Sequence, residues 1–310
     1  MSGVTDLAFR DLAYDLGAGL VISEMVASEH LVRDRHHARD KARAGKGRPF
    51  VIQLAGCEAR WMAEGAGLAE DLGADIIDIN MGCPAREVTG KQSGSALMRD
   101  LDHALTLIEA TVGATSLPVT LKMRLGWDHD SRNAPELARR AEAAGIRLLT
   151  VHARTRCQFF KGAADWRFVR AVKEAVRIPI VINGDIVDPQ AARTALRESG
   201  ADAVMVGRGA YGAPWMPKRI ADALETGTDA GDPTLEMQAA IAVAHLDAMI
   251  DHEGSRGLHA ARKHIGWYLT RSGRTPHEVK AWRQRLCTLD DARAVRAGLA
   301  AFYDQAQEAA

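Results

Sequence analysis

Seven short apolar runs recur along the first 207 residues, and their repetition constrains the fold more than any other feature. Each run is about five residues long, and amphipathic segments of helix length separate them. Continuous apolar runs of this kind are typical of parallel strands that helices cover on both faces. The runs are GLVIS (19–23), FVIQL (50–54), DIIDI (75–79), PVTLK (118–122), RLLTV (147–151), PIVIN (179–183) and AVMVG (203–207).

The spacing of these runs favours a closed α/β barrel over a doubly wound sheet. Successive runs begin about 25 to 40 residues apart, as in the strand–helix repeat of a (β/α)8 TIM barrel. Glycine is expected to end four of the intervening helices, at Gly17, Gly73, Gly145 and Gly200. Residues 1–19 predict a loop and a helix, so the count is one strand short. We therefore predict a barrel whose first strand is either absent or lies upstream of Met1.

The C-terminal part of the chain has a different pattern. Residues 225–234 (ETGTDAGDPT) are typical of a linker, and beyond them apolar residues recur at helical spacing. We predict a barrel domain over 1–226 and a small all-α helical bundle over 235–310. Ten basic residues between 254 and 296 oppose three acidic ones. The basic residues are Arg256, Arg262, Lys263, Arg271, Arg274, Lys280, Arg283, Arg285, Arg293 and Arg296.

Composition limits the kind of protein more than it identifies the activity. The chain is 47% hydrophobic, which excludes disorder, and its 40 Lys and Arg balance 40 Asp and Glu. The basic surplus of the helical region is therefore local, and it suits binding to a phosphate backbone. The four cysteines form no CxxC pair, so neither a metal site nor a disulfide framework is predicted. Without a signal peptide or a membrane span, a soluble, cytoplasmic protein is expected.

Polar residues close the apolar runs, where barrel enzymes place their chemistry. Six runs end in Glu24, Gln53, Asn80, Lys122, His152 and Asn183, and the seventh ends in Gly207-Arg208-Gly209. One polar strand end has little meaning, but six of them predict a shared polar site at the mouth of the barrel.

Two of these strand ends indicate a phosphate ligand. The segments NGD (183–185) and GRG (207–209) offer backbone N–H groups and an arginine, although their glycines could simply permit tight turns. The string GRGAYG (207–212) matches the dinucleotide fingerprint G-x-G-x-x-G. Because it follows the last strand instead of the first, we reject a Rossmann interpretation.

Lys122 and Gln53 are expected to face a planar ligand from the barrel mouth. A lysine could stabilise negative charge on a reduced flavin ring, and a glutamine can donate and accept hydrogen bonds at the ring edge. The chemistry alone leaves a sugar phosphate or a Schiff-base substrate open, so an aldolase-type lysine is an alternative.

Cys83 lies between a glycine and a proline in the loop after the third run. An ordinary thiol has a pKa of about 8.5 and is mostly protonated at neutral pH, so it can donate a proton. A free cysteine is more often a small buried hydrophobe, and that interpretation stays open. Arg86 and Lys91 in the same loop suit an anionic or nucleic-acid substrate, or are plain surface charges.

Six segments in order resemble the tRNA-dihydrouridine synthases, in particular the bacterial DusB-like branch. They are SGVTDLAFR, INMGCPAREVTGKQSGSALM, LKMRLGWD, VHARTRCQFFKGAADW, VINGDI and MVGRGAYGAPW. The resemblance runs from Met1 to about Trp215, and the helical region agrees with the family's C-terminal domain.

The resemblance implies reduction of the C5–C6 double bond of particular uridines in tRNA, with FMN as cofactor and NADPH as reductant. Cys83 would be the proton donor. The implied FMN contacts are Gln53, Lys122, His152, Asn183, Gly184, Asp185, Gly207 and Arg208, with Met1 and Ser2 where the family's first strand gives backbone contacts. The implied tRNA contacts are Asn80, Lys91, Arg154 and Arg156.

Two alternative functions make different predictions. The first is an FMN barrel that acts on a free pyrimidine, as a dihydroorotate or dihydropyrimidine type of dehydrogenase does, and it gives the basic helical region no role. The second is a non-catalytic RNA-binding protein on a barrel scaffold, which predicts degraded strand ends and no thiol. Which tRNA uridine is reduced does not follow from the sequence.

Overall fold

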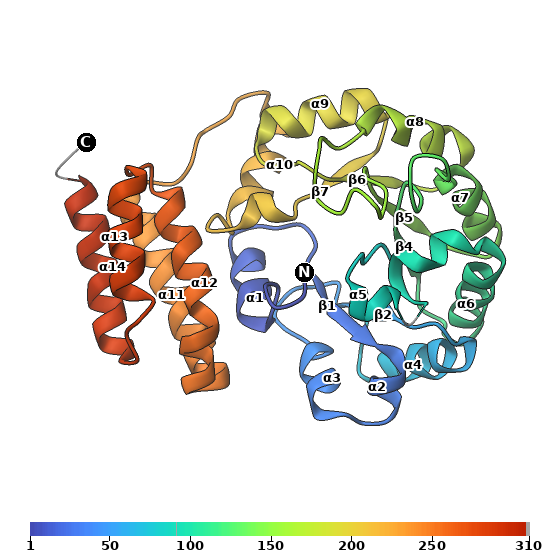
Figure 1. Ribbon diagram of the computed structural model, residues 1–310, viewed down its shortest axis with the longest axis horizontal. Coiled ribbons are helices and arrows are strands. Elements are labelled where there is room, and N and C mark those ends of the chain that lie inside the picture. Colours follow the sequence, from blue (N-terminus) through green and yellow to red (C-terminus); the bar gives the residue numbers. More distant parts are fainter. Residues whose placement is uncertain (91, 308–310) are drawn as a thin grey trace. The chain divides into compact units, whose positions relative to one another are not determined.

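The computed structural model describes residues 1–90 and 92–307. The chain divides into two compact units, Met1–Arg208 and Gly209–Ala310, which are described separately below (Figure 1).

The first unit is a parallel α/β sheet of the TIM-barrel type. Its seven strands are hydrogen-bonded in chain order, each to the next, and helices surround the curled sheet (Figure 1). The predicted α/β barrel class and six of the seven predicted strands are confirmed, and the first strand lies further along the chain than predicted. The strands are β1 (Ile22–Ala27), β2 (Val51–Ala55), β3 (Ile76–Met81), β4 (Val119–Arg124), β5 (Leu148–His152), β6 (Ile180–Asn183) and β7 (Ala203–Met205).

Local sequence explains where the surrounding helices begin and end. The side chains of Asp100, Asp165 and Asp188 accept backbone N–H groups at three helix N-termini. The four predicted terminal glycines all have positive φ angles, as a left-handed C-terminal residue requires. The helices are α1 (Leu7–Asp15), α2 (Ser28–Val32), α3 (His36–Lys41), α4 (Ala59–Asp71), α5 (Arg86–Thr89), α6 (Leu101–Gly113), α7 (Ala134–Ala143), α8 (Trp166–Ala175) and α9 (Pro189–Ser199), with 3-10 turns η1 (Gly94–Arg99) and η2 (Arg208–Ala210).

The first strand is a correction to the sequence prediction. The run 19–23 was expected to form it, but β1 spans Ile22–Ala27. Glu24, expected at the strand end, therefore lies within β1, where its carboxylate accepts the backbone N–H of Gly3. Pairing of β1 with β2 explains the shift, because Met25 to Ala27 align with Gln53 to Ala55 despite the polar residues before them.

The second unit contains the helical C-terminal region that the sequence predicted. Four helices follow the linker: α11 (Leu235–Glu253), α12 (Ser255–Arg271), α13 (Pro276–Leu286) and α14 (Ala292–Gln307). Buried apolar side chains from these helices, among them Leu246, Ile265 and Phe302, form their core. Helix α10 (Met216–Thr226) groups with this unit, whereas the sequence assigned it to the domain 1–226.

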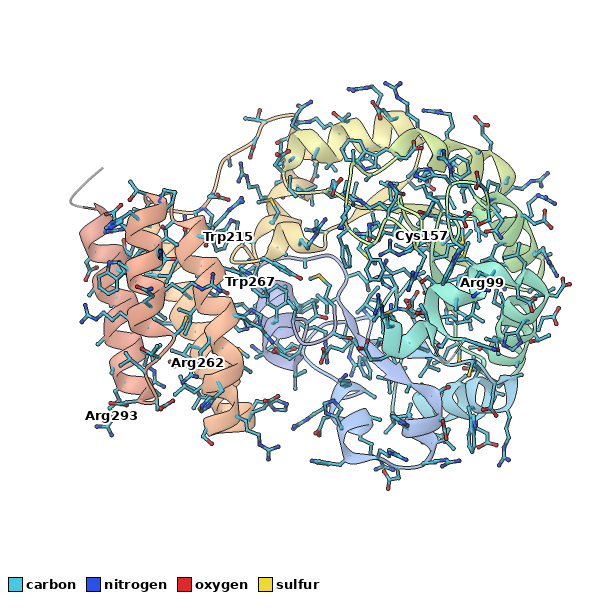
Figure 2. All side chains as sticks on the ribbon, in the orientation of Figure 1. Arg99, Cys157, Trp215, Arg262, Trp267 and Arg293 are labelled. Atoms are coloured by element: carbon cyan, nitrogen blue, oxygen red, sulfur yellow. The ribbon has the colours of Figure 1, made fainter. Side chains whose placement is uncertain are left out.

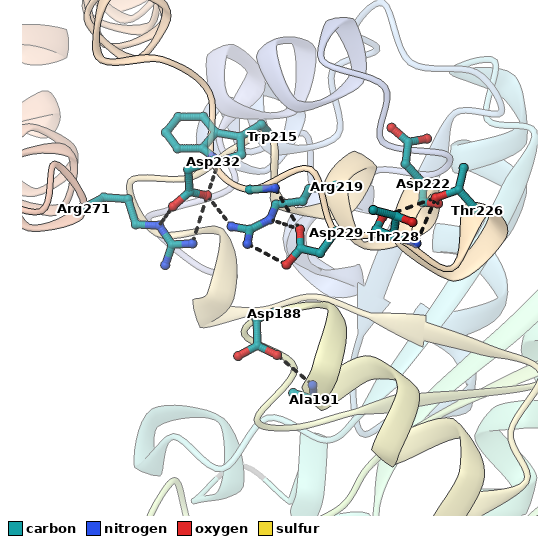
Figure 3. A network of polar contacts seen from close by, with 11 residues as sticks. Asp188, Ala191, Trp215, Arg219, Asp222, Thr226, Thr228, Asp229, Asp232 and Arg271 are labelled. Atoms are coloured by element: carbon teal, nitrogen blue, oxygen red, sulfur yellow. Dashed lines mark hydrogen bonds and ion pairs between the residues drawn. The ribbon is translucent and has the colours of Figure 1, made fainter.

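Ion pairs hold the predicted linker in place (Figure 3). Asp232 Oδ1 accepts the indole N–H of Trp215 at 2.8 Å and Arg219 Nη1 at 2.6 Å. Arg271 of α12 pairs with the same carboxylate at 3.1 Å, and Arg219 makes two hydrogen bonds to Asp229. The segment between α10 and α11 is thus tied to both α10 and α12.

Within residues 1–90 and 92–307, none of the helices has the length and apolar character needed to cross a membrane.

Candidate active site

A chain of buried amides and one carboxylate links the neighbouring strands β2, β3 and β4. Gln53 Nε2 donates to Asp78 Oδ2 at 2.7 Å, and Asn80 Nδ2 donates to Gln53 Oε1 at 2.8 Å. Thr120 Oγ1 donates to the other oxygen of Asp78 at 2.7 Å. Burial raises the pKa of Asp78, against the effect of these two donors. The network therefore fixes the Gln53 amide by holding both its N–H and its carbonyl group.

Lys122 adds a positive charge beside this network, on β4 opposite Asn80 of β3. Its Nζ lies 3.3 Å from Asn183 Oδ1, and Asn183 donates in turn to the backbone carbonyl of Met205 at 2.8 Å. Burial lowers the pKa of Lys122 to about 8, with further lowering by Arg124. An anionic group that binds beside Lys122 would raise its pKa again, because the anion stabilises the charged form of the lysine.

The loop that carries Cys83 is held on both sides. Asn80 Oδ1 accepts the backbone N–H groups of Gly82 at 3.1 Å and Cys83 at 2.9 Å. The Cys83 carbonyl accepts both the backbone N–H of Ser95, at 3.0 Å, and its hydroxyl, at 2.8 Å. Gly94 has φ +59°, and a Cβ there would approach the Cys83 carbonyl oxygen to 2.8 Å. The half-buried thiol thus sits on a loop with little freedom.

Arg124 is a residue of this site that the sequence reasoning missed. It is 1% exposed, and its Nε donates to the Gly82 carbonyl at 2.7 Å. Its Nη1 donates to the carbonyls of Thr155 and Phe159, which joins the Cys83 loop to the loop after β5. Burial lowers its pKa to about 10. Its position two residues beyond Lys122 on one strand, and hence on the same face, was an available signal.

Arg154 is buried within the protein and does not lie on the surface of the site. The resemblance implied an RNA contact, but the residue is 2% exposed. Its Nη2 donates to Asp185 Oδ2 at 2.5 Å and to the Gly162 carbonyl at 2.7 Å, and its Nε donates to the Lys161 carbonyl at 3.2 Å. The guanidinium is therefore used within the protein, where it holds the loop after β5.

Asp185 connects this buried arginine to an exposed one. Asp185 Oδ2, which accepts Arg154, also accepts the backbone N–H of Ala164 at 2.9 Å. The other oxygen, Oδ1, lies 3.5 Å from Arg208 Nη2. Asp185 has a positive φ of 54°, which turns it away from the line of β6. The carboxylate thus orients Arg208 at this edge.

His152 and Gly184 pack tightly beneath the same edge. Gly184 has φ +113°, and a Cβ built on it would lie 2.9 Å from His152 Cδ2. Its carbonyl accepts the indole N–H of Trp166 at 2.9 Å. Burial, reinforced by Lys122 and other nearby cations, lowers the pKa of His152, so its ring is neutral.

Phe160 is the second residue that the sequence reasoning missed. Its side chain is 50% exposed, although Arg154, six residues earlier in the chain, is buried. The Cζ atoms of Arg208 and Arg124 lie 5.1 and 5.5 Å from its ring centroid, and the His152 ring lies 6.2 Å away. An exposed aromatic ring among these polar groups offers a stacking surface at the mouth.

The remaining predicted residues lie at the edges of the cluster. Met1 and Ser2 are exposed, and a Cβ built on Gly207 would lie 3.8 Å from both Met1 Sδ and Asn183 Nδ2. Arg156 is half-buried. Lys91 lies outside the described residues.

A separate cavity of about 210 Å³ opens at the ends of β1 and β2. Ser28, Cys57, Trp61 and Ser93 are among the residues that line it. Of the described lining residues, none belongs to the predicted site.

Comparison with known proteins identifies relatives of the whole chain. The family model described as dihydrouridine synthase matches residues 1–307. A probable tRNA-dihydrouridine synthase of Rhizobium leguminosarum bv. phaseoli is 57% identical over 272 residues, 87% of this chain and 84% of that protein. The tRNA-dihydrouridine synthase B of Pseudomonas putida is 42% identical over 311 residues, 99% of this chain and 91% of that protein. Among solved structures, 6-hydroxypseudooxynicotine amine oxidase of Pseudomonas geniculata N1 aligns at 16% identity with a TM-score of 0.48, over 78% of this chain and 47% of that chain.

Proposed function

Because the chain belongs to the dihydrouridine synthase family, we propose that it reduces uridines of tRNA to 5,6-dihydrouridine, with FMN as cofactor and NADPH as reductant. The observation that carries the proposal is that Lys122 meets Asn183, while Asn80, which aligns with Lys122 on the neighbouring strand, connects Gln53 to the Cys83 loop. Cations, amides and a thiol on one edge suit a charged planar cofactor and a substrate that needs a proton.

The donor set at this edge fits FMN. The phosphate of FMN carries between one and two negative charges at neutral pH, so it needs a cation and N–H donors. Arg208 is exposed and oriented by Asp185, so it can supply the cation. Lys122, with its lowered pKa, suits the part of the ring that becomes anionic on reduction.

We assign the cofactor to the residues implied by the family motifs, which are Gln53, Lys122, His152, Asn183, Gly184, Asp185, Gly207 and Arg208, together with Met1 and Ser2. Within this set the roles differ. Arg208 would hold the phosphate, Lys122 the ring, and Asp185 would position Arg208. When bound, the flavin supplies a hydride, obtained from NADPH, to C6 of the uracil.

Cys83 is assigned to proton transfer. Its S–H would give a proton to C5 of the uracil, so that one hydride and one proton convert the C5–C6 double bond to a single bond. The thiolate then recovers a proton from solvent. Asn80 and Ser95 hold the backbone N–H and carbonyl of Cys83, which limits the positions that the thiol can take.

The target uridine must leave its stack to reach a site at the strand ends. Arg156 and Lys91 are proposed to meet the RNA directly. Asn80 and Arg154 were assigned to the same contact, but both are buried, so we propose that they position the Cys83 loop and Asp185 instead.

The helical unit is proposed to bind the tRNA backbone, as the family's C-terminal domain 235–310, while residues 1–226 carry the catalysis. Four of its ten basic residues are paired with carboxylates: Arg262, Arg271, Arg274 and Arg296. Five others are exposed, and among the side chains that the structure describes none of these has an ion-pair partner: Arg256, Lys280, Arg283, Arg285 and Arg293. Figure 2 labels one residue of each kind, Arg262 and Arg293.

The test is a single-turnover reoxidation. The protein is loaded with FMN, reduced anaerobically with NADPH, and mixed with tRNA that lacks dihydrouridine, with free uracil and orotate as separate controls. Rapid reoxidation by tRNA alone, with dihydrouridine formed, is the expected result. Reoxidation by the free pyrimidines alone would replace the proposal with the small-molecule dehydrogenase.

Cys83→Ala and Cys57→Ala make a matched pair, because both residues are half-buried cysteines in loops after neighbouring strands. Cys83→Ala is expected to slow tRNA-dependent reoxidation at least 100-fold while NADPH still reduces the flavin. Cys57→Ala is expected to react as the unmodified protein does. Equal rates in the two variants would remove Cys83 from the proton transfer.

A further inference from the structure

Two arginines share one tryptophan ring beside the proposed active site. The Cζ atom of Arg99 lies 4.9 Å from the ring centroid of Trp127, and that of Arg156 lies 4.6 Å from it. Arg156 also lies 4.9 Å from the ring centroid of Phe159. Arg99 ends η1, Trp127 follows β4, and Arg156 follows β5, so three separate loops meet here. We call Arg99, Trp127 and Arg156 the Trp127 cluster.

Backbone hydrogen bonds join the loop that carries Trp127 to the loop that carries Arg156. The backbone N–H of Arg156 donates to the Gly126 carbonyl at 3.0 Å, and that of Cys157 donates to the Trp127 carbonyl at 2.8 Å. Gly126 has φ +155°, and a Cβ on it would meet the Ser131 carbonyl oxygen at 2.0 Å. The tryptophan is therefore a rigid platform, and the two guanidiniums rest on it.

The charges of the cluster are not neutralised. Among the described residues, no carboxylate pairs with Arg99 or with Arg156, and Arg99 is exposed. Because both guanidiniums lie within 5 Å of one centroid, they are no more than about 10 Å apart, close to one Debye length at physiological salt. They repel each other, and an anionic group that binds between or beside them removes this repulsion.

Arg132 shows what a structural arginine looks like in the same loop. Its Cζ lies 4.7 Å from the ring centroid of Phe168, so it too rests on an aromatic ring. Its Nη1, however, donates to Asp165 at 2.7 Å, and the pair is partly buried. Arg132 thus combines an aromatic contact with a carboxylate partner, whereas Arg99 and Arg156 have no carboxylate partner among the residues that the structure describes.

We propose that the Trp127 cluster is a binding site for RNA phosphate groups next to the target uridine, with Arg99 and Arg156 as the phosphate ligands and Trp127 as their support. This rests on the proposed function. Both guanidiniums lie over the ring, Arg99 is exposed and Arg156 is half-buried, and a guanidinium can make two-point contacts to phosphate oxygens. Arg99 and Trp127 have no role in the cofactor site, so the cluster adds to the set of substrate-binding residues.

The test compares Arg99→Ala with Arg132→Ala in equilibrium binding of tRNA that lacks dihydrouridine, measured by fluorescence anisotropy over a series of salt concentrations. Arg99→Ala is expected to weaken binding about 5- to 20-fold at low salt and to reduce the slope of log K against log salt by about 1. Arg132→Ala should keep the slope of the unmodified protein. Equal slopes for Arg99→Ala and the unmodified protein would overturn the proposal.

A second measurement uses Cys157, which is exposed and adjoins Arg156 in the chain. Figure 2 labels Cys157 and Arg99. In Cys83→Ala protein, tRNA is expected to slow the alkylation of Cys157 several-fold, and in Cys83→Ala/Trp127→Leu protein the protection should be mostly lost. Alkylation at one rate with and without tRNA would also overturn the proposal. If the unmodified protein reduces tRNA while both tests fail, the proposed function stands and the cluster alone is wrong.

Discussion

The side-chain carbonyl of Asn80 accepts the backbone N–H of Cys83 at 2.9 Å while its amide donates to Gln53 at 2.8 Å. One side chain therefore connects the loop of the proposed proton donor to the proposed cofactor contact. Both bonds are at least partly buried, so water does not replace them easily if they are lost.

Asn80→Ala is accordingly expected to slow tRNA-dependent reoxidation of the reduced flavin about 10- to 100-fold. The loop would then be held only through its carbonyls, by Ser95 and Arg124 among the described side chains, and a displacement of about 1 Å at a reacting group can lower a rate by that factor. Stopped-flow absorbance of the flavin measures it. Gln190→Ala is the control, since Gln190 lies on α9 and its amide donates to Thr194 of the same helix. A rate for Asn80→Ala equal to that of the control would contradict the positioning role.

Lys122→Met is expected to make the protein without cofactor more stable at pH 7, by about 2 kcal/mol. The ordinary lysine pKa is 10.5, and burial lowers that of Lys122 to about 8. Below pH 8 the lysine is charged in both states, so the folded state bears the full penalty. Between pH 8 and 10.5 only the unfolded state keeps the proton, and the penalty declines.

The measurement is urea unfolding of both proteins at several pH values between 7 and 10. The advantage of Lys122→Met should shrink as the pH rises. An advantage that grows with pH would show that the assigned direction of the pKa shift is wrong. The same variant should bind FMN more weakly, which separates stability from function at this position.

Asp185→Asn is expected to weaken FMN binding about 10-fold and to lower the free energy of unfolding by about 2 kcal/mol. Arg208 would lose the carboxylate that orients it, and the buried Arg154 would lose its countercharge. Quenching of flavin fluorescence and urea unfolding measure the two effects. Asp188→Asn is the matched control, because Asp188 caps α9 and asparagine caps as well as aspartate. Equal FMN affinity in both variants would remove Asp185 from the cofactor site.

Gly184→Ala is expected to destabilise the fold by about 2 kcal/mol and to impair FMN binding. The residue has φ +113°, and its new Cβ would press on His152 Cδ2 at 2.9 Å. Gly227→Ala provides the comparison, since Gly227 has φ +80° but nothing within 4 Å of a Cβ. Gly227→Ala should lower stability by about 1 kcal/mol through backbone strain alone and leave FMN binding intact. Thermal unfolding and flavin titration of the two variants decide the matter.

The family resemblance and the barrel class could both be recognised in the amino-acid sequence, for different reasons. Motifs such as NMGCP and HARTR are local strings, and the family match over residues 1–307 confirms the resemblance. The strands were found because a strand buried on both faces must be a continuous apolar run. β1 was misplaced because Ser23 and Glu24 interrupt its pattern, while its pairing with β2 decides its true bounds.

The sequence also predicted which polar residues stand near the ends of the strands, but it did not predict where their side chains point. Lys122 and Asn183 were expected at one site, and their side chains do meet. Arg154 was expected to contact tRNA, yet its guanidinium turns inward, because Asp185 and two loop carbonyls accept its hydrogen bonds. Arg124 and Phe160 were missed, since neither stands at the end of an apolar run.

Local pattern was therefore sufficient for the order of the elements and for the polar edge at which they end, because both depend on residues close together in the chain. Which arginine is buried and which is exposed was decided by contacts between distant segments. Arg124 is bonded to a carbonyl 42 residues away and Arg154 to a carboxylate 31 residues away. Such partners meet only when the sheet has curled and its loops have packed against one another.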